Sequence, residues 1–247
     1  MRLFQEPSTM KCNMATKGYI HSFQSLGAVD GPGIRYMVFM QGCPYRCPYC
    51  HNPDTREFIG GKVFYASDIA SKAERYRTYF GSEGGVTVSG GEPLCQREFL
   101  TELFSELHNR GINTCIDTAG IKPDDKLREL LSHTDTVLCD IKYPERKKCL
   151  DLFGVDLDNT LEFLHLCNEM GVKVIIRHVV VPSLTDSEEN ILKIKELLKD
   201  IRYEMIELLP FKKLCHHKYE ALGIPFPMKD TPECSKATIE KLKALLA

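Results

Sequence analysis

The 247 residues of this chain fit one large α/β domain or two small ones, and their 43% hydrophobic and 27% charged content is ordinary for a globular protein. The formal net charge of −2 gives no global basic field, which argues against nucleic acid or an anionic membrane as partner. No apolar stretch reaches the roughly 18 residues that a membrane span requires.

The first segment, Met1 to Lys17, lacks the apolar centre of a signal peptide. We expect it to be a flexible extension ahead of one domain over 18–247, in a cytosolic protein whose thiols stay reduced. The eleven cysteines are an odd number, which argues against a fully paired disulfide framework. Three of them cluster between positions 43 and 50, which predicts one local metal site and otherwise packed or surface thiols.

Apolar runs rich in β-branched residues alternate along the chain with amphipathic segments. We expect strands at 34–40, 85–89, 113–117, 136–141, 173–181 and 204–209. We expect helices at 66–79, 97–109, 124–131, 157–170, 188–199 and 232–246, with Gly111 and Gly171 at helix ends. Six βα units predict an α/β fold with parallel strands and right-handed crossovers, a partial (β/α)6 TIM-like barrel.

The chemically unusual residues follow these strands in order. They are Cys43 to Cys50, Ser89 to Glu92, Asp117 with Thr118, Asp140 to Lys142, Arg177, and Leu209 to Phe211. All except Arg177, which lies within its strand, stand at the carboxyl ends of strands. In parallel barrels that edge carries the active site, so we expect these residues to meet there.

Cys43, Cys47 and Cys50 have the spacing C-x3-C-x2-C. Thiolates are the usual ligands of iron–sulfur clusters and of zinc. His51 is available as the fourth ligand of a structural zinc site, yet a histidine directly after Cys50 makes a poor chelate. A four-iron cluster on three cysteines leaves one iron open, which a catalytic centre needs. The spacing favours the cluster, with zinc as the alternative.

Taken alone, the other residues have plain structural alternatives. The segment Ser89 to Glu92 also suits an ordinary βα turn, and Asp117 and Asp140 also suit the caps of the helices that follow them. Arg177 also suits a surface salt bridge, although a surface ion pair is not expected inside an apolar strand. His51 also suits a loop hydrogen bond.

Further short motifs surround the cysteine loop over about residues 18 to 225. They are Ile20 to Phe23, Val29 to Arg35, Gln41 to Pro53, Thr87 to Pro93, Asp117 to Gly120, Asp140 to Lys142, Arg177 to Pro182 and Leu208 to Pro210. Together they resemble the radical S-adenosylmethionine (radical SAM) superfamily and, within it, the glycyl-radical-enzyme activating enzymes. Many of those enzymes carry a ferredoxin-like insertion rich in cysteine, and its absence from Asn52 to Ser67 favours pyruvate formate-lyase as the partner.

The resemblance implies a radical SAM fold and a 4Fe–4S cluster on Cys43, Cys47 and Cys50. The open iron would chelate the amino and carboxylate groups of S-adenosylmethionine. One electron from reduced flavodoxin or ferredoxin would release methionine and a 5′-deoxyadenosyl radical, which removes a hydrogen atom from a glycine of the partner enzyme. The resemblance also suggests a monomer.

The resemblance assigns roles to residues beyond the cysteines. Gly90, Gly91 and Glu92 would hold the methionine amino group, and Arg177 would pair with its carboxylate. A monovalent cation, bound with a carboxylate oxygen of the cosubstrate, would lie on Asp117, Thr118 and Asp140. The residues that would face the cosubstrate, including its adenine, are Tyr49, Cys50, His51, Asp140, Ile141, Lys142 and Lys212.

One residue departs from the family pattern, and one matched segment also suits an ordinary turn. Lys212 stands where the family pattern has a histidine, and a lysine cannot stack on adenine as imidazole does. The turn Asp30 to Gly33 lies, in the family, near the path of the partner's glycine loop, although two glycines and a proline make a turn by default.

Other functions compete with this hypothesis. The chain could activate another glycyl radical enzyme, or it could be a radical SAM enzyme that acts on a small molecule. A metal-binding interaction module without catalysis is a third alternative. The spread of the motifs over six strand ends disfavours that third one.

Overall fold

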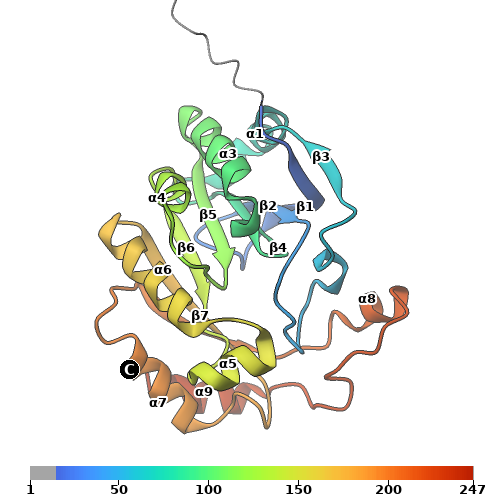
Figure 1. Cartoon of the computed structure of the whole chain (residues 1–247), viewed down its shortest axis with the longest axis vertical. Coiled ribbons are helices and arrows are strands. Elements are labelled where there is room, and N and C mark those ends of the chain that lie inside the picture. The colour runs from blue at the N-terminus through green and yellow to red at the C-terminus, as the bar shows by residue number, and fades with distance from the viewer. Residues whose placement is uncertain (1–14, 247) are drawn as a thin grey trace, which may run out of the picture.

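The computed structural model describes residues 15–246, which form one curved sheet of eight strands with helices around it (Figure 1). The strand order is β3-β1-β2-β4-β5-β6-β7-β8. The strands are β1 (Gly18–Gly27), β2 (Arg35–Met40), β3 (Lys62–Phe64), β4 (Gly85–Gly90), β5 (Asn113–Thr118), β6 (Thr136–Asp140), β7 (Lys173–Val180) and β8 (Met205–Pro210). The run from β2 through β4 to β8 is parallel throughout, which confirms the six predicted parallel strands.

The helices α3, α4, α6 and α7 follow one another along one side of the sheet (Figure 1). The helices of the described residues are α1 (Ala66–Glu74), α2 (Arg77–Phe80), α3 (Arg97–Asn109), α4 (Asp125–Leu131), α5 (Arg146–Phe153), α6 (Leu157–Glu169), α7 (Glu188–Leu197), α8 (His216–Ala221) and α9 (Lys236–Lys243). Two single-turn 3-10 helices lie at η1 (Pro53–Thr55) and η2 (Pro93–Gln96). None of these helices is both long enough and apolar enough to span a membrane.

Local sequence signals set several helix ends. The side chains of Asp124, Ser187 and Ser235 accept hydrogen bonds from the first turns of α4, α7 and α9, as N-cap residues do. Gly111 and Gly171 follow α3 and α6 with φ of +64° and +73°. These left-handed conformations confirm that both glycines stand at helix ends.

Some predicted elements differ from the structure. The predicted helix 66–79 is divided into α1 and α2, and Tyr76 between them stacks on Tyr36 with ring centroids 5.1 Å apart. The predicted helix 232–246 begins only at Lys236, after the Ser235 cap. Strands β1 and β3 and helices α5 and α8 were not predicted. β1 has no apolar run, and it is a strand because it pairs antiparallel with both β2 and β3.

The sheet does not close into a full barrel. Among the described residues, the edge strands β3 and β8 do not pair with each other. The partial barrel predicted from six βα units is therefore confirmed, with β1 and β3 added at one edge. Most of the predicted extension, residues 1–17, lies outside the described residues. Within its described part, the backbone N–H of Thr16 donates to Glu102 of α3 at 2.8 Å.

Successive side chains along each parallel strand point to opposite faces of the sheet, an outer face and an inner one. The outward side chains join the main core, whereas Cys115, Leu138 and Ile175 form a small separate cluster. Two positions further along the same three strands stand Asp117, Asp140 and Arg177. Side chains two residues apart share a face, so the apolar cluster lies beneath a charged row at the carboxyl edge.

Arg35 at the start of β2 is fully buried. Its guanidinium donates to the Thr87 hydroxyl at 2.9 Å, to the Val86 carbonyl at 2.7 Å, and to the Asn113 side chain at 2.8 Å. It also donates to the Glu83 carbonyl at 3.0 Å. One side chain therefore ties β2, β4 and β5 together at the edge opposite the charged row.

We expect Arg35→Met to lower the free energy of unfolding by about 3 kcal/mol, because several buried acceptors lose their donor at once. Urea denaturation under reducing conditions measures the change. Arg146→Met is the matched control, because Arg146 pairs with Asp158 at the surface, where an ion pair contributes little. Equal losses in the two variants would contradict this account of Arg35.

Candidate active site

A cavity of about 390 Å³ lies at the carboxyl edge of the parallel strands. Most of the predicted site residues line it, although they come from separate parts of the chain. They are Cys43, Cys47, Tyr49, Cys50, His51, Gly90, Gly91, Glu92, Asp117, Thr118, Asp140, Lys142 and Arg177. Ile141 and Lys212 do not line it. The structure thus brings together the residues that the strand ends predicted.

The cysteine loop after β2 is held by backbone contacts with distant segments. The N–H of Gly42 donates to the Thr55 carbonyl at 2.8 Å, and the N–H of Cys43 donates to the Arg56 carbonyl at 3.0 Å. From α8, the Tyr219 hydroxyl donates to the Cys50 carbonyl at 3.1 Å. Segments distant in the chain therefore hold the loop in this conformation.

The three clustered cysteines suit an iron–sulfur cluster. Among the described residues, no other cysteine lines the cavity, so a cluster held there would have three cysteine ligands. Burial raises the pKa of Cys43 to about 12 and also raises the pKa of Cys47. Thiolates at these positions therefore need nearby positive charge, which iron supplies when it displaces the protons.

The remaining cysteines of the described residues are free thiols. Cys95 is exposed, and the buried ones are Cys115, Cys139, Cys149, Cys167, Cys215 and Cys234. This confirms the prediction of packed or surface thiols. Cys12, which shared that prediction, lies outside the described residues.

Gly90 and Gly91 let the turn after β4 press against the cysteine loop. The N–H of Glu92 donates to the Gly42 carbonyl at 2.9 Å. A Cβ at Gly91 would lie 2.2 Å from that carbonyl oxygen, and Gly90 has φ +102° with its Cβ position 2.5 Å from Met40 N. Larger residues would push the turn away from Cys43, so the glycines set the cavity's shape.

Glu92 is buried under the cavity and fully hydrogen-bonded. One oxygen accepts from the Thr118 hydroxyl at 2.6 Å and from Leu94 N–H at 3.1 Å, and the other accepts from Ala119 N–H at 3.1 Å. Burial nevertheless raises the pKa of Glu92 to about 7, against the lowering effect of these hydrogen bonds. Its carboxyl therefore braces β5 against the turn rather than projecting freely into the cavity.

Two cations, Lys142 and Arg177, set the charge of the inner face together with the carboxylates that pair with them. Lys142 Nζ lies 2.7 Å from Asp140 Oδ2, and the carboxylate keeps the pKa of Lys142 raised although burial alone would lower it. Arg177 Nε lies 2.9 Å from Glu207 Oε2, and its Nη1 lies 3.9 Å from Asp117 Oδ1. Each cation is thus held beside carboxylates within the cavity wall.

Asp117 and Asp140 do not cap the helices that follow them. Asp117 accepts a hydrogen bond from the Ser89 hydroxyl at 2.7 Å, and its pKa is raised by burial, partly offset by the charge of Arg177. The cap of α4 is Asp124, and the residue before α5 is Glu145. The capping alternative is therefore wrong for both aspartates.

Three further predicted residues, His51, Ile141 and Lys212, make contacts beside the cavity. His51 Nε2 lies 3.0 Å from the Lys212 carbonyl. The Lys212 side chain turns to Glu233, with Nζ 3.0 Å from Oε2. Ile141 is buried, and its N–H donates to the Arg177 carbonyl at 2.9 Å. Lys212 thus lies beside the cavity, and its side chain, paired with Glu233, does not replace the histidine ring of the family pattern.

Sequence reasoning missed several residues around the site. Glu207 is the ion partner of Arg177. It is an acidic residue inside an otherwise apolar strand, and this pattern could have marked it as a site residue. Arg56 and Tyr219 hold the cysteine loop through Cys47 and Cys50, but no local pattern marks them.

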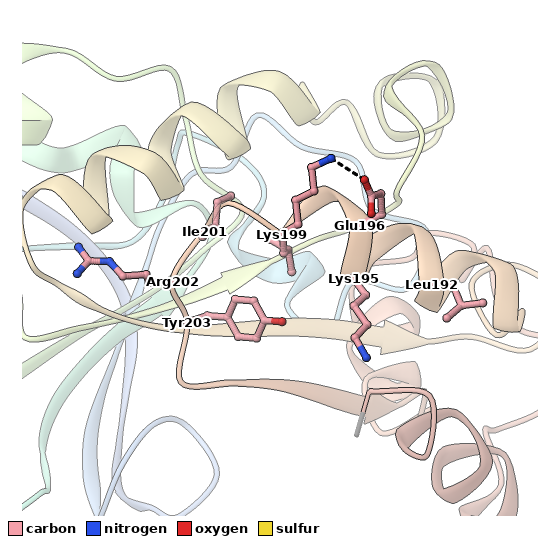
Figure 2. Close-up of a pocket in the computed structure, with 8 residues that line it drawn as sticks. Leu192, Lys195, Glu196, Lys199, Ile201, Arg202 and Tyr203 are labelled. Atoms are coloured by element: carbon pink, nitrogen blue, oxygen red, sulfur yellow. Dashed lines mark hydrogen bonds and ion pairs between the residues drawn. The ribbon is translucent and has the colours of Figure 1, made fainter.

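A second hollow lies away from this site, where α7 ends and the chain turns towards β8. Figure 2 shows Lys199 turned towards Glu196, with Nζ 2.7 Å from Oε1, and Arg202 pointing away from both. The Arg202 side chain donates to the Asn168 carbonyl at 2.6 Å. None of the predicted site residues lines this hollow.

Comparisons with known proteins agree with the site. Residues 37–194 match the Radical SAM superfamily. The chain is 46% identical over 231 residues to the pyruvate formate-lyase-activating enzyme of Clostridium pasteurianum, which spans 93% of this chain and 97% of the relative. It is 42% identical over 223 residues to the enzyme of that name from Staphylococcus aureus, which spans 87% and 89% respectively.

Among solved structures, a domain of the pyruvate-formate lyase-activating enzyme from Bacteroides vulgatus resembles this chain with a TM-score of 0.55. The two are 22% identical, and the match covers 66% of this chain and 92% of that one. At this identity the likeness supports the fold alone.

The raised pKa of Glu92 gives stability a pH dependence. A carboxyl that binds its proton more tightly when folded contributes stability below about pH 4.5, and that contribution is lost as the pH rises to about 7. We therefore expect wild-type protein without cofactor to lose up to about 3 kcal/mol relative to Glu92→Gln over this range. Urea denaturation across the range measures the difference, with Glu129→Gln, at an exposed position, as control. A pH-independent difference for Glu92→Gln would contradict the raised pKa.

Proposed function

Because this chain belongs to the radical SAM superfamily and to its pyruvate formate-lyase-activating enzymes, we propose that it generates the glycyl radical of pyruvate formate-lyase. The observation that carries the proposal is the single cavity that joins the three-cysteine loop to the charged row of β5 to β7. A cluster and a zwitterionic cosubstrate fit side by side in such a space, because thiols line one part and both signs of charge line the other.

Cys43, Cys47 and Cys50 would hold a 4Fe–4S cluster with one iron free for S-adenosylmethionine. When bound, the cluster supplies the single electron that cleaves this cosubstrate to methionine and a 5′-deoxyadenosyl radical. The protein's own residues position the cosubstrate. The turn at Gly90 and Gly91 offers backbone groups to the methionine amino group.

Arg177 would bind the methionine carboxylate. Its guanidinium lies in the cavity wall between Asp117 and Glu207, and Glu207 aligns it from the side. The proposal includes a monovalent cation on Asp117, Thr118 and Asp140, which line the cavity from neighbouring strands. Tyr49, His51 and Lys142 would face the cosubstrate, and the backbone of Ile141 and Lys212 would support that wall.

The substrate would be a flexible glycine-containing segment of pyruvate formate-lyase. Glycine has no side chain, so it can adopt the strained conformation that a narrow cavity requires. Among residues 15–246, β3 and β8 do not pair, which supports lateral access for such a segment, and Asp30 of the predicted contact turn lines the cavity. A reduced flavodoxin or ferredoxin would supply the electron.

The direct test uses anaerobically reconstituted protein, dithionite, S-adenosylmethionine and pyruvate formate-lyase. We expect a glycyl radical by electron paramagnetic resonance. With a peptide that copies the partner's glycine loop and carries α-deuterated glycine, we expect deuterium in 5′-deoxyadenosine. Cys43→Ser should abolish both signals, whereas Cys95→Ser, at an exposed thiol, should keep them.

The opposite pattern would exclude the proposed substrate. If no glycyl radical enzyme or glycine peptide transfers deuterium while a small metabolite does, the chain acts on that metabolite. A radical on another glycyl radical enzyme, with none on pyruvate formate-lyase, would change the partner alone.

We expect Asp117→Ala, Asp140→Ala and Arg177→Ala to weaken S-adenosylmethionine binding about tenfold or more, because each removes a charged group from the cavity wall. Iron content should stay near four per chain in all three. Titration of the reconstituted variants, followed by the cluster's spectrum, measures the affinity. Wild-type affinity in all three variants would show that the cosubstrate binds elsewhere.

A further inference from the structure

Arg56 reaches the cysteine loop from the segment that follows η1. Its Nη2 donates to the Cys47 carbonyl at 2.6 Å and to the Tyr219 hydroxyl at 3.3 Å. The guanidinium carbon lies 5.8 Å from the centroid of the Tyr219 ring, and the Tyr219 hydroxyl donates in turn to the Cys50 carbonyl. The guanidinium is thus fixed beside two of the three cluster cysteines.

The charge of Arg56 is not neutralised by a carboxylate. Among residues 15–246, no Asp or Glu forms an ion pair with it, whereas the other cation near Cys47, Lys142, pairs with Asp140 at 2.7 Å. Arg56 Nε is buried and has no hydrogen-bond acceptor among the same residues. A half-buried cation with an unused donor therefore stands where an anionic group is expected.

We propose that Arg56 is a positioning residue that acts through its contact with Cys47 to raise the reduction potential of the cluster. This inference rests on the proposed function, because it requires the 4Fe–4S cluster. A one-electron donor reduces the cluster from the 2+ to the 1+ state, which adds one negative charge. A nearby unpaired cation and its hydrogen bonds stabilise that charge, and both are known determinants of cluster potential.

Arg56→Gln separates charge from anchoring, because the amide can still donate to the Cys47 carbonyl. We expect iron content to stay at about four per chain. We expect the equilibrium constant for reduction to fall about tenfold, which is about 59 mV for one electron. Dithionite redox titration of the reconstituted protein, without S-adenosylmethionine, measures the potential through the paramagnetic signal of the reduced cluster.

Three variants serve as controls. Arg46→Gln removes an equal charge from the same loop, but Arg46 is exposed and donates to the Cys43 and Tyr45 carbonyls, so the potential should not move. Arg56→Lys keeps the charge and should stay near wild type. Tyr219→Phe removes a hydrogen bond but no charge and should also stay near wild type.

The outcomes are distinct. An unchanged potential in Arg56→Gln, or the same shift in Arg46→Gln, would overturn the inference. If Arg56→Gln loses the cluster, the potential of Arg56→Lys tests the inference instead. A lowered potential in that variant, which retains the charge, would also overturn the inference. A wild-type chain that holds no four-iron cluster would instead overturn the proposed function, and with it the inference.

Discussion

Opposite charges buried on the inner face of an open parallel sheet are the constraint on which this structure depends. Asp117, Asp140 and Arg177 each stand two positions beyond a residue of one apolar cluster, and strand register places Asp140 beside Arg177 and Asp117 beside Leu138. Charges this deep are tolerated only when they are paired, and Lys142 and Glu207 supply the partners. The result is a cavity wall that carries charges of both signs.

The cysteine loop depends on a different kind of support. Hydrogen bonds to its backbone come from η1 and the residue after it, from the turn after β4, and from the Tyr219 hydroxyl of α8. Gly91 permits one of these contacts because any side chain there would collide with the Gly42 carbonyl. The shape of the loop thus depends on residues up to 169 positions away.

The open sheet links the fold to the substrate. A full eight-stranded parallel barrel has its interior filled by side chains and leaves access only at the ends. Here β1 and β3 extend one edge in the antiparallel sense, and the other edge ends at β8. Among the described residues the sheet therefore stays open between β3 and β8, and the proposed access of a partner segment depends on this opening.

The sequence by itself determined the six parallel strands, most helix positions and many of the residues that line the cavity, because periodicity, capping residues and strand ends are local signals. It also identified the cysteine loop, whose short spacing carries its chemistry. Only the tertiary structure decided that β1 is a strand, because its polar sequence is stabilised by pairing with β2 and β3. It alone placed Glu207 beside Arg177, turned the Lys212 side chain to Glu233, and set Arg56 against the cysteine loop. Such contacts join residues distant in the chain, and no local pattern encodes which of them the fold brings together.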